Sequence, residues 1–201
     1  MASYEKQGES DEWYTPAYIF EALGVLFDLD VACPPEGPRH VPTARWFTKE
    51  QDGLSEDWNG LVWMNPPFGH QSTKKLWLRK FFDHGNGIAL LPDRTSAPWW
   101  QEFAPLADAI LFMSPKVKFE MPEGEIPAAR QMAQDGLTPR EISKRTRFSV
   151  SNVERIIAGE DIIEAPGTGT TLLATGPEEA AALLSATSLG HAFHPARCAV
   201  A

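Results

Sequence analysis

The sequence predicts an α/β protein built on a mostly parallel sheet, and two observations support this. Short apolar runs that fit buried strands occur at residues 25–33, 61–64 and 88–91. Helical patterns lie around them, with apolar residues every three or four positions over residues 16–23 and 73–84. Strands that alternate with helices are typical of βαβ units, in which helices cover both faces of a parallel sheet.

The composition fits a folded domain with at most one small additional module. Hydrophobic residues make up 43% of the chain and charged residues 22%, which supplies enough apolar material for a core. No apolar run approaches the length of a transmembrane helix, and the N-terminal segment lacks the apolar core of a signal peptide. Cys33 and Cys198 have no metal-ligand spacing, so we expect free thiols in a cytoplasmic protein without membrane contact.

The apolar run 61–64 ends in Asn65, Pro66, Pro67 and Phe68. Proline has no N–H for a sheet ladder, so a strand must stop here. Proline also fixes its own φ and biases the preceding residue toward an extended backbone, so the turn is stiff. An amide side chain, two carbonyls and an aromatic ring are then held at the carboxyl end of a strand, where open α/β sheets bind ligands.

This arrangement suits recognition of an amino group on a flat ring. Such an amine can donate its two hydrogens to the Asn65 side-chain oxygen and the Pro66 carbonyl, while Phe68 stacks on the ring. Accepting both hydrogens raises the lone-pair density on the nitrogen, which becomes a usable nucleophile toward a methyl sulfonium held in line. Without further context, the same tetrapeptide would also fit a simple strand-ending turn.

At these residues the sequence resembles the amino-methyltransferases that use S-adenosyl-L-methionine and carry a (D/N/S)-P-P-(Y/F) tetrapeptide. The segment Asp11–Pro16, D-E-W-Y-T-P, resembles the opening signature of phage-type DNA N6-adenine methyltransferases. Residues 43–67 match that family's pattern T-A-x-x-(Y/F)-T…D-G-L-x-x-x-W-x-G-x-V-(W/Y)-x-N-P-P almost throughout. The resemblance implies a Rossmann-like methyltransferase that methylates adenine N6 in DNA, with the target base flipped out to reach Asn65.

The resemblance also implies where the cofactor S-adenosyl-L-methionine binds. In the family the Thr-Pro turn lies against the cofactor, although Thr15 and Pro16 also fit the N-cap and first position of a helix. A segment F-D-L-D-P-(C/A) has its counterpart at Phe27–Cys33, with Val31 in place of the usual proline. The expected cofactor-binding residues are Tyr14, Thr15, Pro16, Asp28, Asp30, Cys33 and Asn65, and the strongest candidate is Asp30.

Asp30 is the preferred candidate because a carboxylate in an apolar strand is costly unless a partner hydrogen-bonds it. Ribose hydroxyls or the ammonium group of the cofactor would satisfy that need. The alternative is an edge strand with its acids turned toward solvent. The chain lacks the F-x-G-x-G loop that most such methyltransferases carry after the first strand, and we expect the turn 30–35 to replace it.

A second module is predicted between two late strands. In the family a strand of the type S-V-L-L-A-x-G soon follows K-V-(K/R)-F, whereas here residues 170–176 follow 117–119 after about fifty residues. Residues 109–113 and 117–119 resemble the family's antiparallel end hairpin. We expect a methyltransferase domain in residues 1–124 and 164–201, with an insertion at 125–163.

Within the insertion the sequence predicts three short helices and resembles the helix-turn-helix of resolvases and sigma-like regulators. Gly136 ends the first helix, Thr138 begins the second, and Ser149 or Ser151 caps the third. The local charge over residues 128–158 is about +3 in a chain of net charge −9, which favours DNA contact over a purely structural decoration. The expected DNA-binding residues are Arg94, Arg140, Lys144, Arg147, Ser151, Asn152 and Arg155; for Arg94, a surface ion pair is equally compatible.

Other functions share parts of this pattern. Cytosine-N4 and RNA guanine-N2 methyltransferases use the same tetrapeptide logic, and protein-glutamine methyltransferases also carry N-P-P but would leave the helix-turn-helix unexplained. A catalytically inactive DNA-binding regulator on the same scaffold is the alternative from another class. We expect a phage- or prophage-encoded protein in a bacterial host; the recognition sequence, oligomeric state and biological role stay open.

Overall fold

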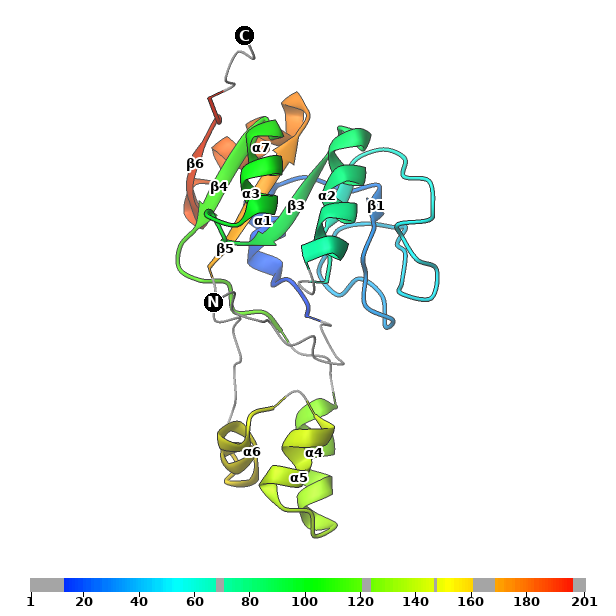
Figure 1. Ribbon diagram of the computed structural model, residues 1–201, viewed down its shortest axis with the longest axis vertical. Coiled ribbons are helices and arrows are strands. Elements are labelled where there is room, and N and C mark those ends of the chain that lie inside the picture. Colours follow the sequence, from blue (N-terminus) through cyan, green and yellow to red (C-terminus); the bar gives the residue numbers. More distant parts are fainter. Residues whose placement is uncertain (1–12, 68–70, 121–123, 147, 161–168, 197–201) are drawn as a thin grey trace.

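The computed structural model describes residues 13–67, 71–120, 124–146, 148–160 and 169–196 (Figure 1). The helices are α1 (Ala17–Leu23), α2 (Gln71–His84), α3 (Pro98–Phe103), α4 (Glu125–Gln134), α5 (Pro139–Arg145), α6 (Val150–Ile157) and α7 (Pro177–Ser185). The strands are β1 (Leu29–Asp30), β2 (Val62–Met64), β3 (Gly87–Pro92), β4 (Ala109–Met113), β5 (Thr170–Thr175) and β6 (Gly190–Phe193).

The strands form one six-stranded mixed sheet in the order β1-β2-β3-β5-β4-β6. β1, β2 and β3 are parallel, and β5 runs antiparallel to both of its neighbours, β3 and β4. β4 therefore points the same way as β1 to β3, and the carboxyl ends of these four strands lie at one edge of the sheet. The predicted Rossmann-like α/β fold is confirmed, but the sheet is mixed instead of mostly parallel: only β1 to β3 pair in parallel, and the β3–β5, β4–β5 and β4–β6 pairings are antiparallel.

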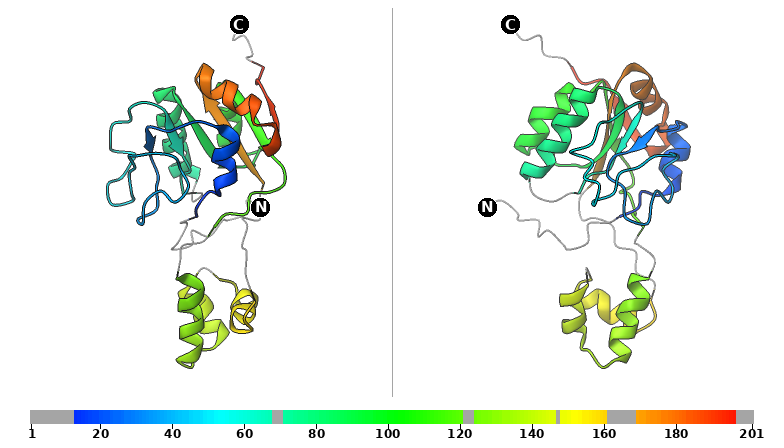
Figure 2. Two further views of the ribbon diagram at one scale, coloured as in Figure 1. Left: turned by 180° about the vertical axis from the view of Figure 1, so that it is seen from behind. Right: turned by 90° about the vertical axis from the view of Figure 1, so that its right-hand side faces the viewer.

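Helices cover both faces of the sheet, which Figure 2 shows from two sides. Along the central strands, side chains alternate between two cores. Trp63 and Ile88 pack on the side of α1 and α7, where Trp63 meets the ring of Phe20 edge-on at 4.8 Å. Val62 and Ala89 pack on the side of α2 and α3. Because both faces are covered, every residue of β3 is buried.

Two strand predictions were wrong in extent or partner. The first strand is confined to Leu29–Asp30, because the backbone around it bonds to a loop: the Asp30 N–H donates to the Arg45 carbonyl at 3.0 Å and the Phe47 N–H to the Asp30 carbonyl at 2.8 Å. Residues 117–119 form no strand, and the antiparallel neighbours of β4 are β5 and β6 instead.

The helices α4, α5 and α6 pack around a small core of their own and lie apart from the sheet in Figure 1. This core consists of Ala129, Ile142, Phe148, Val153 and Ile156. The three short helices predicted from the sequence are present. Thr138 and Glu141 form a capping box at the start of α5, and Ser149, not Ser151, caps α6 by accepting from the Asn152 N–H at 3.2 Å.

A close backbone approach fixes the loop beneath β1. A Cβ added at Gly53 would lie 2.1 Å from the Val31 carbonyl oxygen, which is backbone and cannot move aside cheaply. We expect Gly53→Ala to lower the free energy of unfolding by about 3 kcal/mol, because overpacking forces the loop off β1. Urea denaturation followed by tryptophan fluorescence measures this.

Gly24→Ala is the matched control. Gly24 has φ +63° but open space around its Cβ position, so only the backbone conformation opposes the substitution. The expected cost is about 1 kcal/mol. Equal losses in the two variants would contradict the role assigned to the Gly53 contact.

Candidate cofactor and substrate site

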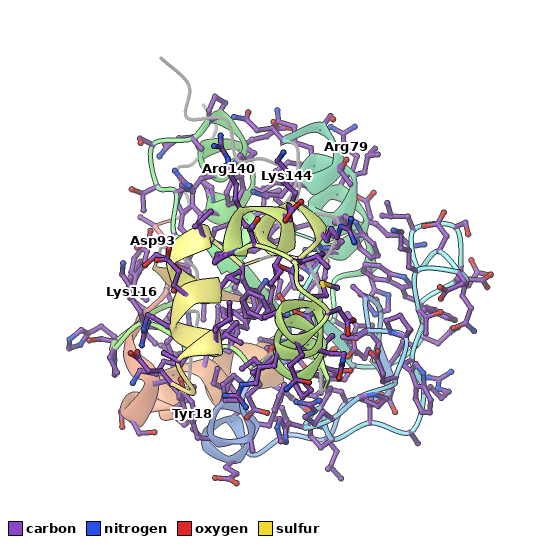
Figure 3. The ribbon with its side chains drawn as sticks, turned by 90° about the horizontal axis from the view of Figure 1, so that it is seen from below. Tyr18, Arg79, Asp93, Lys116, Arg140 and Lys144 are labelled. Carbon is purple, nitrogen blue, oxygen red and sulfur yellow. The ribbon has the colours of Figure 1, made fainter. Side chains whose placement is uncertain are left out.

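The site is built at the sheet edge where four parallel-running strands end. Asp30 is the last residue of β1, Asn65 follows β2 directly, and Asp93 follows β3. Figure 3 views the molecule from this end, with Asp93 and Lys116 on it and the helices α4 to α6 in front. The topology of the sheet therefore brings together residues that lie far apart in the sequence.

Asp30 is a buried carboxyl group, with only 3% of its surface exposed. Its Oδ1 accepts from the Ala32 N–H at 3.1 Å, and the Cys33 thiol bonds to it as well. These bonds favour the charged form, but burial outweighs them and raises the pKa of Asp30 to about 7. In turn, burial together with the neighbouring Asp30 raises the pKa of the Cys33 thiol, which keeps that thiol protonated and unreactive.

Asn65 is held at the other side of the site. Its Nδ2 donates to the Thr15 hydroxyl at 3.5 Å, a long hydrogen bond. Thr15 is buried, and it does not cap α1: the N-cap is Pro16, and no side chain bonds to the first turn. The expected N-cap role of Thr15 is therefore wrong, and its hydroxyl faces Asn65 instead.

Asp30, Asn65, Tyr14 and Thr15 line one cavity. Its other walls come from Trp13, Ala32, Trp63 and the loop residues Pro34, Pro38, Arg39, His40 and Val41. The cavity measures about 20 Å³, which is room for about one water molecule. Its polar groups fit a nucleoside cofactor with an amino-acid tail: a carboxylate for hydroxyls or an ammonium group, and an arginine for a carboxylate. The space must widen before a molecule of that size can enter.

Other expected residues lie outside this cavity. Asp28 is exposed, and its Oδ2 accepts from the Leu61 N–H at 2.8 Å, so it stabilises the turn before β2. Pro16 and Cys33 are buried beside the cavity without lining it. Pro66 is buried and Pro67 exposed, whereas Phe68 lies outside the described residues, so its stacking role stays a prediction.

Sequence reasoning placed the turn 30–35 at the cofactor but assigned no role to residues 36–41 of the loop 34–41. Its residues carry no motif, and the clustered prolines at 34, 35 and 38 predicted only an irregular segment. Arg39 and His40 nevertheless line the same cavity as Asp30 and Asn65. The one signal in the sequence was the position of this loop directly after β1, at the edge where ligands bind.

The expected DNA-binding residues fall in two places. Arg94 is half-buried at the sheet edge after β3. Four others lie on two of the small helices: Arg140 and Lys144 are exposed on α5, and Ser151 is exposed and Asn152 half-buried on α6, whereas Arg147 lies outside the described residues. Arg155 donates from Nε to Glu160 at 2.7 Å.

Within the described ranges, no helix is long and apolar enough to cross a membrane.

Burial of Asp30 gives the protein without cofactor a characteristic pH dependence. The folded pKa of about 7 lies above the unfolded value of about 4, so the folded protein binds more protons between these pH values. The free energy of unfolding therefore falls as the pH rises through this window. Asp30→Asn removes that loss, and we expect it to be more stable than wild type by roughly 2 to 4 kcal/mol at pH 8.

Urea denaturation of both proteins at pH 5 and pH 8 checks this expectation. Asp57→Asn, at an exposed aspartate, is the control, and its free energy of unfolding should change between pH 5 and pH 8 as much as that of wild type. If the free energy of unfolding of Asp30→Asn changed with pH as that of wild type does, Asp30 would be ionised and solvated in the folded state.

Comparison with known proteins adds a family to this geometry. A family model described as "DNA N-6-adenine-methyltransferase (Dam)" matches residues 2–147, which is more than half of the chain. Comparisons with curated proteins and with solved structures gave no match. The matched range contains β1 to β4 and the Asn65 turn, and it ends before β5. The chain belongs to the Dam family of DNA N6-adenine methyltransferases, enzymes that act on DNA and use S-adenosyl-L-methionine.

Proposed function

We propose that Asn65 and Pro66 bind the amino group of the target adenine. The Asn65 side-chain oxygen and the Pro66 carbonyl accept its two hydrogens, and the Asn65 amide nitrogen is steadied by Thr15 at 3.5 Å. The supporting observation is that Asn65 and Asp30 come from neighbouring strand ends and line one cavity. A substrate amine and a cofactor can thereby meet at a single point.

The chemistry then needs no strong base. With both hydrogens engaged, the lone pair of the amino nitrogen is freed from conjugation with the ring and points along the line of attack. When bound, S-adenosyl-L-methionine supplies a methyl group on a sulfonium, whose sulfur leaves as a thioether. The proton of the methylated nitrogen passes to the Asn65 oxygen and on to water after transfer. The work of the side chains is alignment, which supplies much of the acceleration of such a transfer.

We assign cofactor binding to Asp30 with Tyr14, Thr15 and Asn65. The buried Asp30 carboxyl offers acceptors for ribose hydroxyls or for the ammonium group. A cationic partner would draw its pKa of about 7 back down, so cofactor binding near neutral pH would release protons. Phe68 would clamp the flipped base from its position three residues after Asn65.

We further propose that residues 125–163 form a helix-turn-helix insertion that contacts DNA. Its attachment points support this. Glu120, five residues before α4 begins, pairs with Tyr14 through two backbone hydrogen bonds of 2.9 Å, and the carbonyl of Gly169, on the C-terminal side, accepts from the Asp93 N–H at 2.7 Å. Glu120 is bonded to Tyr14 and Gly169 to Asp93, and Asp93 lies at the strand end viewed in Figure 3, so DNA held by the insertion would pass the site.

Within the insertion, α5 and α6 have different roles. Arg140 and Lys144 on α5 are exposed and suit phosphate contacts. On α6, Ser151 is exposed at the first turn, where a recognition helix meets base edges, and Arg155 must leave Glu160 to reach DNA. The resemblance of the segment 11–16 to phage-type enzymes leads us to propose a phage- or prophage-encoded protein acting in the bacterial cytoplasm.

Asn65→Ala tests the catalytic assignment. We expect N6-methyladenine in plasmid DNA co-expressed with wild type and at least a hundredfold less with the variant, because one of the two amine acceptors is gone. Nucleoside mass spectrometry after complete digestion measures this. Asn59→Ala, at an exposed asparagine before β2, is the control with wild-type methylation. Equal amounts of N6-methyladenine with Asn65→Ala and Asn59→Ala would remove Asn65 from the mechanism. If wild type produced N4-methylcytosine and no N6-methyladenine, the proposed target base would be wrong.

The double variant Arg140→Ala/Lys144→Ala tests the insertion. We expect weaker binding to duplex DNA of any sequence and a salt dependence of log Kd reduced by about 2, one for each lost phosphate contact. Fluorescence anisotropy across a salt series measures both quantities. Lys49→Ala removes an equally exposed cation from the sheet domain and serves as control. An unchanged salt slope in the double variant would contradict DNA contact through α5.

A further inference from the structure

We propose that Glu120 is a positioning residue that fastens the loop 34–41 over the cofactor cavity. This loop is the wall that moves when the cofactor enters or leaves, and the carboxylate of Glu120 holds it closed. The inference rests on the proposed cofactor site and extends it to residues that no sequence motif marks.

The loop is the longest stretch of the cavity wall that lies outside any helix or strand. The walls formed by Trp63 and Asp30 belong to buried strands of the sheet, and Tyr14 and Thr15 are buried as well. The loop contributes Pro34, Pro38, Arg39, His40 and Val41, all of them half-buried and outside any helix or strand. Since the closed cavity measures only about 20 Å³, admission of a nucleoside cofactor requires this loop to swing outward.

Glu120 makes the contacts that hold the loop in place. Its Oε2 accepts from His40 Nε2 at 2.9 Å and from Arg39 Nη1 at 3.5 Å. Its own position is fixed, because its backbone N–H and carbonyl both bond to Tyr14 at 2.9 Å. The carboxylate therefore lies beside the cavity and contacts the loop 34–41.

Tyr14 provides a second fastening on the same loop. Its hydroxyl donates to Glu36 at 2.8 Å, and the Arg39 guanidinium lies over its ring at 4.0 Å. The Glu120 carboxylate is 41% exposed, so water competes for its ion pair with Arg39 and its hydrogen bond with His40. Such contacts favour the closed loop but are weak enough to break. The loop must open in every turnover, because the cofactor is consumed and exchanged.

Glu120→Gln tests this role through the kinetics of the cofactor. We expect S-adenosyl-L-methionine to dissociate roughly three- to tenfold faster and its KM to rise, because the weakened contacts with Arg39 and His40 favour the open loop. The kcat at saturating cofactor stays within about twofold of wild type, since the chemical step uses other residues. Stopped-flow tryptophan fluorescence measures dissociation, with Trp13 and Trp63 in the cavity wall.

Glu102→Gln is the matched control. Glu102 is 40% exposed and pairs with Lys75 and with Arg79 at 3.6 Å, far from the cavity in sequence and on the α2–α3 side of the sheet. It should leave cofactor dissociation unchanged. His40→Ala should also accelerate dissociation, and the double variant should be no faster than Glu120→Gln alone, because the contact between Glu120 and His40 is already weakened in that variant.

Three results would overturn the proposal. The first is that Glu120→Gln and His40→Ala release the cofactor at the wild-type rate. If wild type nevertheless methylates DNA and Asn65→Ala does not, the proposed function holds and only the role of Glu120 is wrong. Another is a fall in kcat without faster dissociation, which would place Glu120 in the chemical step. Absence of S-adenosyl-L-methionine binding by wild type would overturn both this inference and the cofactor site.

Discussion

The site depends on where β2 stops. β2 is covered on both faces, so its backbone polar groups have only sheet partners while the strand continues. Pro66 removes the donor that would extend the ladder, and the chain must leave the sheet at Asn65. An amide and a carbonyl are thus released from sheet pairing at the one place where a neighbouring strand end contributes a buried carboxyl group. Methyl transfer to an amine needs that combination of acceptors beside a cofactor.

Much of the fold follows from patterns that the sequence displays openly. The runs that became β2, β3, β4 and β5 are apolar because both faces of the sheet are covered, and such runs are visible without a structure. The pairing of these strands is a different matter. β5 lies between β3 and β4 although the whole insertion separates it from them in sequence, and nothing local in 117–119 distinguishes its buried side chains from those of a strand.

The candidate site divides in a similar way. Asn65, Thr15 and Asp30 belong to motifs, and the structure places them around one cavity. Asp28 shares the motif with Asp30, but it lies in the bend before β1, where its exposed carboxylate accepts from the Leu61 N–H. Glu120 and His40 could not be predicted, because their contact joins positions far apart in sequence and depends on the path of two irregular segments.

The attachment of the helical insertion has a consequence for how the enzyme searches DNA. Glu120 and Gly169, the described residues on either side of these helices, both bond to the strand-end side of the sheet, at Tyr14 and Asp93. In the proposed complex, in which the helices bind a duplex, the pocket would meet only the nearby adenines, at a high effective concentration. The choice of adenine would then depend on its distance from the bound helices as much as on base recognition in the pocket.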